Sequence, residues 1–275
     1  MDYKRILTIQ DISCLGQCSG TVALPVLSAC GHEACILPPA ILSTHTGGFG
    51  APVVRNLTGD MFAIRSHWES QGIRFDLILT GYLGSVAAIG EVNAIVDDML
   101  APGGKLIVDP AMADHGRLYS GFDETYAAAM KQLCSRADIL LPNITEAAMM
   151  SGMPFLETYD ESYIRQLLNG LDGKRVLLTG VGFDSEQAGF ALRCGDDIRF
   201  GHHERLPGSF HGTGDLFAAA FVGALACGRD DYEAAEIASA FTLRSIQNTL
   251  ERPAHWYGVK FETALPYLME LLNIK

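Results

Sequence analysis

Hydrophobic residues fall into short unbroken runs that alternate with longer stretches of mixed polarity. The runs are rich in β-branched residues and are bounded by Gly, Pro or Asp, which is typical of strands buried on both faces. They occupy residues 5–9, 33–38, 75–81, 105–110, 137–143 and 175–180. Helical patterns lie between them, at 19–30, 60–71, 85–100, 123–135, 144–151 and 160–170. This alternation predicts an α/β sandwich of three layers, with a mostly parallel central sheet covered by helices on both faces.

The order of elements changes after residue 180. Residues 188–194 and 197–202 have the pattern of two strands joined by the turn "GDD", which predicts an antiparallel hairpin at the edge of the sheet. Three further helices are expected at about 213–227, 231–250 and 262–272. Residues 38–56 are rich in Pro and Gly, and we interpret them as a short strand and a loop that is a candidate lid. No repeat or linker interrupts the pattern, so residues 1–275 are expected to form one domain.

Composition and charge exclude some classes of molecule that the protein could bind. The chain of 275 residues is 48% hydrophobic and carries a formal net charge of -12, which argues against a nucleic-acid partner because such binding needs a basic surface. No apolar run approaches the roughly 20 residues that span a bilayer, so no membrane partner is expected. The odd number of cysteines, seven, and the absence of a CxxC pair favour reduced thiols in a cytoplasmic protein. A zinc site at Cys14, Cys18 and a histidine is a weaker alternative.

Polar residues follow many of the predicted strands at the point where each strand ends. Ligands of open α/β sheets bind at the carboxyl ends of the strands. The residues found there are Gln10 and Asp11, residues 44–48, Gly81 and Tyr82, Asp109 and Pro110, residues 143–146, and Thr179 and Gly180. Because such residues also serve as ordinary caps and turns, this pattern indicates a ligand edge without identifying the ligand.

The stretch "HGTGDLFAAAFVGA" places Gly212, Thr213, Gly214 and Asp215 directly before a helix that is apolar on every face. The first turn of a helix has free N–H groups and the positive end of the helix dipole, and glycines allow an anion to approach closely. Phosphoryl transfer to an alcohol needs both features, because the amides hold the phosphoryl charge while Asp215 accepts the hydroxyl proton. An ordinary helix cap is the alternative. The chain has neither the P-loop signature nor a dinucleotide-binding GxGxxG turn.

The stretch "FHGTGDLFAAAF" resembles the C-terminal signature of the ribokinase-like superfamily, and in particular that of the pyridoxal (vitamin B6) kinases. Further stretches match in order and spacing: "LTIQD", "ILSTHTGGF", "LTGYLGS", "VDPAMADHGRLY" and "LLPNITEA". The resemblance implies a ribokinase-like fold and an ATP-dependent kinase that phosphorylates the 5′-hydroxymethyl group of pyridoxal, pyridoxamine or pyridoxine. It also implies Mg²⁺, leaves room for a monovalent cation, and suggests a homodimer.

The same resemblance assigns roles to particular residues. It makes Asp215 the general base and Gly212, Thr213 and Gly214 the anion hole. The implied nucleotide positions are Asp109, Asp114, Tyr119, Asn143, Glu146, Thr179 and Gly180, with Asp109 and Glu146 holding the metal largely through water. The implied substrate positions are Asp11, Thr46 and Tyr82, to which we add His45 as a neighbour of Thr46.

Several alternatives stay open at this point. Asn143 and Glu146 have the spacing of a capping box, Tyr82 could pack in the core, and His45 could only orient its loop. Asp11 stands where the family often has a small hydroxyl residue, and a carboxylate there could pair with a protonated ring or an amine, which favours pyridoxamine. An unperturbed aspartate is expected to suffice as the base. A hydroxymethylpyrimidine kinase, another small-alcohol kinase of this fold, and a non-catalytic nucleotide-binding protein are the competing functions.

Overall fold

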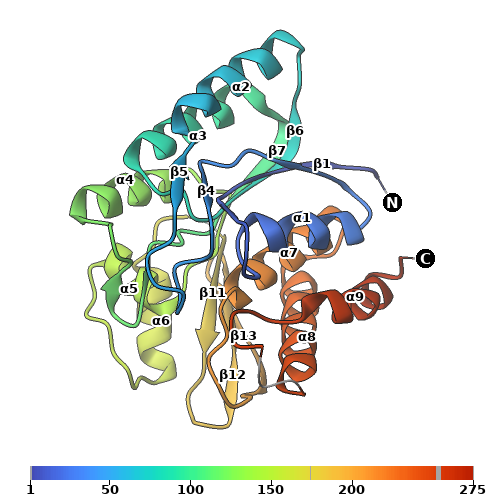
Figure 1. The fold of residues 1–275 in the computed structure, drawn as a ribbon. Helices are drawn as coiled ribbons and strands as arrows, with labels where there is room; N and C mark the ends of the chain where they lie inside the picture. The colour runs from blue at the N-terminus through green and yellow to red at the C-terminus, as the bar shows by residue number, and fades with distance from the viewer. Residues whose placement is uncertain (1, 174, 252–254, 275) are drawn as a thin grey trace.

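An eight-stranded sheet runs through the middle of the protein, in the order β13-β12-β11-β10-β7-β6-β1-β3 (Figure 1). The computed structural model describes residues 2–173, 175–251 and 255–274. Six strands pair in parallel: β1 (Arg5–Ile9), β3 (Glu33–Ile36), β6 (Phe75–Thr80), β7 (Leu100–Val108), β10 (Ile139–Leu140) and β11 (Arg175–Val181). Inner strands such as β6 are buried on both faces, which explains their unbroken apolar sequences.

The last two strands of the sheet confirm the predicted edge hairpin. β12 (Gln187–Cys194) pairs antiparallel with both β11 and β13 (Asp197–Glu204). Two other strands differ from the prediction in length. β7 begins at Leu100 rather than at residue 105, because the stretch with Pro102 and two glycines still pairs with β6 after a register shift. β10 is only two residues long.

Helices cover both faces of the sheet and confirm the predicted three layers (Figure 1). One face carries α2 (Thr58–Ser70), α3 (Val86–Met99), α4 (Glu124–Ser135), α5 (Ile144–Ser151) and α6 (Glu161–Asn169). The other carries α1 (Gly20–Ala29), α7 (Thr213–Ala226), α8 (Asp231–Leu250), the short 3₁₀ helix η1 (Phe261–Ala264) and α9 (Leu265–Leu272). None of the described helices is long and apolar enough to cross a membrane.

Two hydrophobic cores lie on the two faces of the sheet. Successive side chains of a strand point to opposite faces, so Leu7 of β1 belongs to the core under α2–α6 while Ile6 belongs to the core under α1 and α7–α9. Helix α7 is buried from Leu216 to Ala224, which agrees with its all-round apolar sequence. The helix therefore runs through the second core, and only its amino end reaches the edge of the sheet.

Residues 38–56 contain more regular structure than the single short strand we expected. They form β4 (Ala40–Leu42) and β5 (Val54–Asn56), which build a three-stranded sheet with β2 (Ile12–Ser13). A second small element, the ribbon of β8 (Ala113–Asp114) and β9 (Arg117–Leu118), was also not predicted. Strands of two or three residues are too short to show a period of two, so the sequence pattern cannot indicate them.

Candidate active site

The amino end of α7, the β8–β9 ribbon and the carboxyl ends of the parallel strands surround one cavity of about 850 Å³. All of the site residues expected from the sequence line it: Asp11, His45, Thr46, Tyr82, Asp109, Asp114, Tyr119, Asn143, Glu146, Thr179, Gly180, Gly212, Thr213, Gly214 and Asp215. The structure thus brings together residues from across the chain. Their individual roles stay predictions.

The turn before α7 leaves backbone amides facing the cavity. Gly212 is the N-cap, with φ 76°, and it offers no side-chain cap. The first helical bond runs from the Leu216 N–H to the Gly212 carbonyl at 3.0 Å, so the preceding amides have no partner within the helix. A Cβ on residue 212 would collide with the Gln17 carbonyl oxygen, whereas a Cβ on Gly214 would meet open space. Gly212 therefore allows the turn to pack closely against Gln17, and Gly214 leaves open space beside the turn for an anion.

Asp215 lies in the first turn of α7, and its pKa is raised to about 6. Burial is the main cause, and the charge of Asp11 adds to it, while the backbone N–H of Ser19 acts in the opposite direction. The expectation of an unperturbed aspartate is therefore wrong. The carboxyl group is poised much nearer to neutral pH than a solvent-exposed one, which suits a general base that must accept and release a proton.

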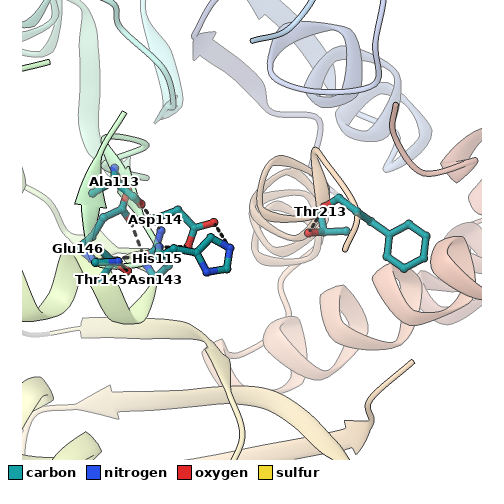
Figure 2. A network of polar contacts seen from close by, with 9 residues as sticks. Ala113, Asp114, His115, Asn143, Thr145, Glu146 and Thr213 are labelled. Carbon is teal, nitrogen blue, oxygen red and sulfur yellow. Dashed lines mark hydrogen bonds and ion pairs between the residues drawn. The ribbon is translucent and has the colours of Figure 1, made fainter. Parts of the chain in front are cut away.

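Glu146 and Asn143 form the opposite wall and hold the β8–β9 ribbon (Figure 2). They make a capping box at the start of α5, in which Asn143 Oδ1 accepts from the Glu146 N–H at 3.0 Å and Glu146 Oε2 accepts from the Asn143 N–H at 3.0 Å. Glu146 Oε1 also accepts from the Met112 N–H at 2.8 Å, and Asn143 Nδ2 donates to the Ala113 carbonyl at 2.8 Å. The capping alternative is therefore correct, and the same two side chains also reach the cavity.

Three carboxyl groups are crowded around the middle of the cavity. Burial and the charges of Glu146 and Asp215 raise the pKa of Asp109 well above its usual range. Burial raises the pKa of Glu146 to about 7, although its three backbone N–H donors oppose the shift. Such crowding calls for a cation. The described residues hold no cluster of three or more His, Cys, Asp or Glu with metal-binding geometry, at Cys14 and Cys18 or elsewhere. A metal here would rely on one or two carboxylates plus water and ligand oxygens, as Mg²⁺ does.

The far end of the cavity, near β1 and β6, combines a buried acid with stacked rings. Asp11 is only 3% exposed and accepts a hydrogen bond from Ser13 Oγ at 3.0 Å. Burial raises its pKa. Tyr82 stacks on Phe122 with ring centroids 5.2 Å apart, and Phe122 stacks on Tyr126 at 3.7 Å. Tyr82 therefore presents a supported aromatic face beside a carboxyl group.

The remaining predicted residues sit on or just after the β8–β9 ribbon and at the end of β11. Asp114 is exposed on the β8–β9 ribbon and lies 3.5 Å from His115 Nε2. Tyr119 follows the ribbon and is 37% exposed, which suits a movable cover. Thr179 donates its N–H to the Pro142 carbonyl at 2.9 Å, and Gly180, with φ 74°, has open space where a Cβ would lie. Gly180 thus leaves backbone without a side chain at this wall.

Sequence reasoning missed one end of the cavity, which α7 and α8 line with Phe217, Ala218, Ser239, Thr242 and Ile246. The Thr242 hydroxyl is buried and has no hydrogen-bond partner among the described residues. Ser239, Thr242 and Ile246 are spaced by three and four, so they share one helix face. That spacing is the sequence signal that could have indicated this wall of the cavity.

Arg117 on β9 was also missed. It is the sole lysine or arginine among the described residues that line the cavity. In a wall so rich in carboxyl groups, this side chain is the natural partner for an anionic ligand.

Comparisons with known proteins place these features in context. The family model described as phosphomethylpyrimidine kinase matches residues 26–259. A crystal structure of pyridoxal kinase from Lactobacillus plantarum is 34% identical and superimposes with a TM-score of 0.89 over 98% of each chain. A Bacteroides thetaiotaomicron protein, described as a candidate phosphomethylpyrimidine kinase and crystallised with pyridoxal, is 30% identical, with a TM-score of 0.90 over 97% of this chain and 96% of that one. A pyridoxine/pyridoxal/pyridoxamine kinase of Bordetella bronchiseptica is 25% identical over 90% of this chain and 89% of its own length.

Proposed function

The chain belongs to the phosphomethylpyrimidine kinase family of the ribokinase-like superfamily, and from this premise we propose how it phosphorylates the 5′-hydroxymethyl group of a B6 vitamer. The protein is an ATP-dependent kinase of B6 vitamers. One observation carries the mechanism. The amino end of α7, with Asp215 in its first turn, opens into the same cavity as Asp109 and Glu146. An alcohol, a transferable phosphoryl group and a base can meet there.

At the acceptor, Asp215 takes the proton of the hydroxyl group while the hydroxyl oxygen bonds to the γ-phosphorus of ATP. The bond between that phosphorus and the bridging oxygen breaks, and ADP leaves with the electron pair. The amides of Gly212, Thr213 and Gly214 point at the oxygens of the moving phosphoryl group. Preorganised donors of this type contribute roughly 3–4 kcal/mol each in other enzymes. The chemistry needs positioning and charge stabilisation more than covalent help.

At the donor, the crowded carboxyl groups fit Mg²⁺. Asp109 would hold the ion, and Glu146 would act through water because both of its oxygens already accept backbone N–H groups. The bound ion would neutralise phosphate charge. Arg117 on the β8–β9 ribbon would pair with a phosphate oxygen, and Thr179 and the bare backbone of Gly180 would border the phosphates. Ser239 and Thr242 would face the nucleoside.

At the vitamer, Tyr82 would stack on the pyridine ring and Thr46 would contact its substituents. Asp11 would pair with the protonated ring nitrogen or with the amine of pyridoxamine, which makes pyridoxamine the favoured acceptor. The family description and the Bacteroides relative make hydroxymethylpyrimidine the second candidate acceptor.

The function is tested by supplying purified protein with Mg-ATP and, separately, pyridoxal, pyridoxamine, pyridoxine and hydroxymethylpyrimidine. ADP release is followed with a coupled assay, and the 5′-phosphate is identified by mass spectrometry. We expect turnover with at least one B6 vitamer and none without Mg²⁺. Protein with ATP alone is the control for uncoupled hydrolysis. Turnover with hydroxymethylpyrimidine but with no vitamer would replace the proposed substrate.

We also propose a cytoplasmic homodimer. All seven cysteines are free, as expected for a reducing compartment. The edge strand β5 and the residue before it expose Val53 and Val54, with 77% and 57% of their surfaces accessible. Exposed valines on an edge strand form a surface that proteins tend to cover, and a second copy of this chain is the partner that a homodimer supplies.

A further inference from the structure

Both ring nitrogens of His45 are hydrogen-bonded to main-chain atoms. Nδ1 accepts a hydrogen bond from the Gly47 N–H at 3.0 Å, and Nε2 lies 2.9 Å from the Tyr257 carbonyl oxygen. A carbonyl can only accept, so Nε2 must carry the proton and Nδ1 must not. Burial lowers the pKa of the imidazole, which favours this neutral form. Neither nitrogen is left to bind a substrate, although the ring lines the cavity.

The His45 ring belongs to an aromatic cluster built from three distant parts of the chain, which we define as His45, Phe49, His211, Trp256 and Tyr257. The His45 centroid lies 5.0 Å from that of Phe49 and 4.9 Å from that of His211. The Phe49 centroid lies 4.6 Å from that of Trp256. The cluster thus joins the loop 43–53, the turn before α7 and the segment 255–258.

Glycines allow the backbone to approach these rings. A Cβ on Gly16 or on Gly47 would collide with the rings of His45 and His211 respectively. A Cβ on Gly48 would lie 2.5 Å from the Trp256 ring. The "HTGGF" stretch therefore fits against the cluster without room for side chains. The path of the loop depends on the rings that it meets.

The segment 255–258 is itself fixed to the body of the protein. His255 Nε2 is hydrogen-bonded to Gln17 Oε1, and Gln17 Nε2 donates to Glu262 Oε1 at 2.7 Å. The carbonyl of Gln17 in turn packs against Gly212. The segment is therefore braced against the same loop that shapes the anion-binding turn.

We propose that residues 255–258 act as a strap that holds the loop 43–53 in its vitamer-binding path, and that His45 is the positioning residue that connects the two. This inference rests on the proposed function to the extent that the loop, through Thr46, contacts the vitamer. His45 then influences vitamer affinity without contacting the reacting atoms.

Two substitutions separate the two hydrogen bonds of His45. His45→Gln can place an amide N–H near the Nε2 position and keep the bond to Tyr257. His45→Asn can place an oxygen near the Nδ1 position and keep the bond to Gly47, but it is too short to reach Tyr257. We expect His45→Asn to raise the vitamer KM about tenfold, the effect of losing a well-placed hydrogen bond. Its kcat and its KM for ATP should stay within about twofold of wild type. His45→Gln should resemble wild type.

Hydrogen exchange measured by mass spectrometry gives a readout that does not depend on turnover. Peptides from 43–53 should exchange faster in His45→Asn than in wild type or His45→Gln. Trp256→Ala is the second variant, because a side chain that is 49% exposed can be removed with little risk to folding. It should also raise the vitamer KM and loosen the loop.

The outcomes are distinct. Unchanged KM and unchanged loop exchange in both His45→Asn and Trp256→Ala would overturn the strap. Impairment of His45→Gln with a wild-type-like His45→Asn would assign the effect to the Gly47 bond instead, and equal impairment of both variants would assign it to the ring rather than to the bond with Tyr257. A loss of kcat with an unaltered KM would make His45 part of the chemistry. If wild type turned over no vitamer, the proposed function would fail, and loop exchange would still decide whether the strap exists.

Discussion

Asp215, Asp109 and Glu146 come from elements far apart in the chain, and each has a raised pKa because it is shielded from water near another acid. The motif "GTGD" was enough to locate Asp215 in the sequence. It was not enough to predict its acidity, because the surroundings that shift the pKa include Asp11 and the Ser19 backbone, some 200 residues earlier in the chain. A sequence motif identifies a group, while its proton affinity is a property of the folded environment.

The raised pKa of Asp215 gives a testable pH dependence. In the proposed mechanism the carboxylate is the active form, and it is protonated below its pKa of about 6, so kcat/KM should fall as the pH falls through about 6. The measurement is a pH profile between about pH 5 and pH 8 at saturating Mg-ATP, where a bound Mg²⁺ would keep Asp109 and Glu146 ionised.

The matched variant is Asp215→Asn, which keeps the shape of the side chain and removes the base. It should lose at least about 100-fold in kcat while nucleotide binding persists. The acid limb near pH 6 should also disappear. Near-normal turnover in this variant would remove Asp215 from the mechanism.

His45 is a second residue whose position was predictable from the sequence but whose interactions were not. Its position next to Thr46 indicated a place in the pocket, and it does line the cavity. Its partner Tyr257 lies 212 residues later, and no local pattern connects the two. The sequence thus placed His45 at the cavity, but its hydrogen-bond partners could be identified only in the tertiary structure.

Among the elements, the helices and the long strands were predictable and the smallest strands were not. Helix α7 starts at Thr213, at the residue expected from the sequence, because its apolar run and its glycine cap are both local signals. The β8–β9 ribbon has only two residues in each strand, and its position depends on backbone bonds to Glu146. Hydrophobic periodicity could therefore not predict this ribbon, although its stretch "VDPAMADHGRLY" resembles the kinase family.

The turn that starts α7 can be tested through its glycines. Gly212→Ala should distort the turn, because the new methyl group would meet the Gln17 carbonyl and the residue has a φ of 76°. We expect a loss of about 1–3 kcal/mol in the free energy of unfolding and a fall in kcat of at least about tenfold. Chemical denaturation and steady-state kinetics would measure the two effects.

Gly214→Ala is the matched control for that variant. Its new methyl group would meet open space, so the free energy of unfolding should stay the same or rise slightly. Equal stability of the two variants would contradict the proposed tight packing of Gly212 against Gln17.

For the whole molecule, the three-layer arrangement followed from the order of strands and helices, because parallel strands need crossover helices. The small sheet β2-β4-β5 did not follow from that order. It leaves β5 as an edge strand whose three residues are all exposed. A sequence pattern cannot show which edge lacks a neighbour, so the exposed edge that we propose as the dimer surface could be recognised only in the structure.

The proposed homodimer is tested at that edge. Wild-type protein should elute as a dimer in size-exclusion chromatography with light scattering, and Val53→Glu should shift it toward a monomer because a charge opposes burial of the strand edge. Leu156→Glu, at an exposed leucine elsewhere, is the control and should remain dimeric. A monomeric wild type would contradict the proposal.

The two walls of the cavity are backed by different hydrophobic cores. Helix α5, with Glu146, packs in the core on one side of the sheet, and helix α7, with Asp215, packs in the core on the other. The distance between Glu146, which we propose on the metal side, and Asp215, the proposed base, therefore depends on how the two cores align across the sheet. A misplacement of roughly 1 Å can cost about a hundredfold in rate. Substitutions deep in either core, far from the cavity, can thus change kcat by shifting α5 relative to α7.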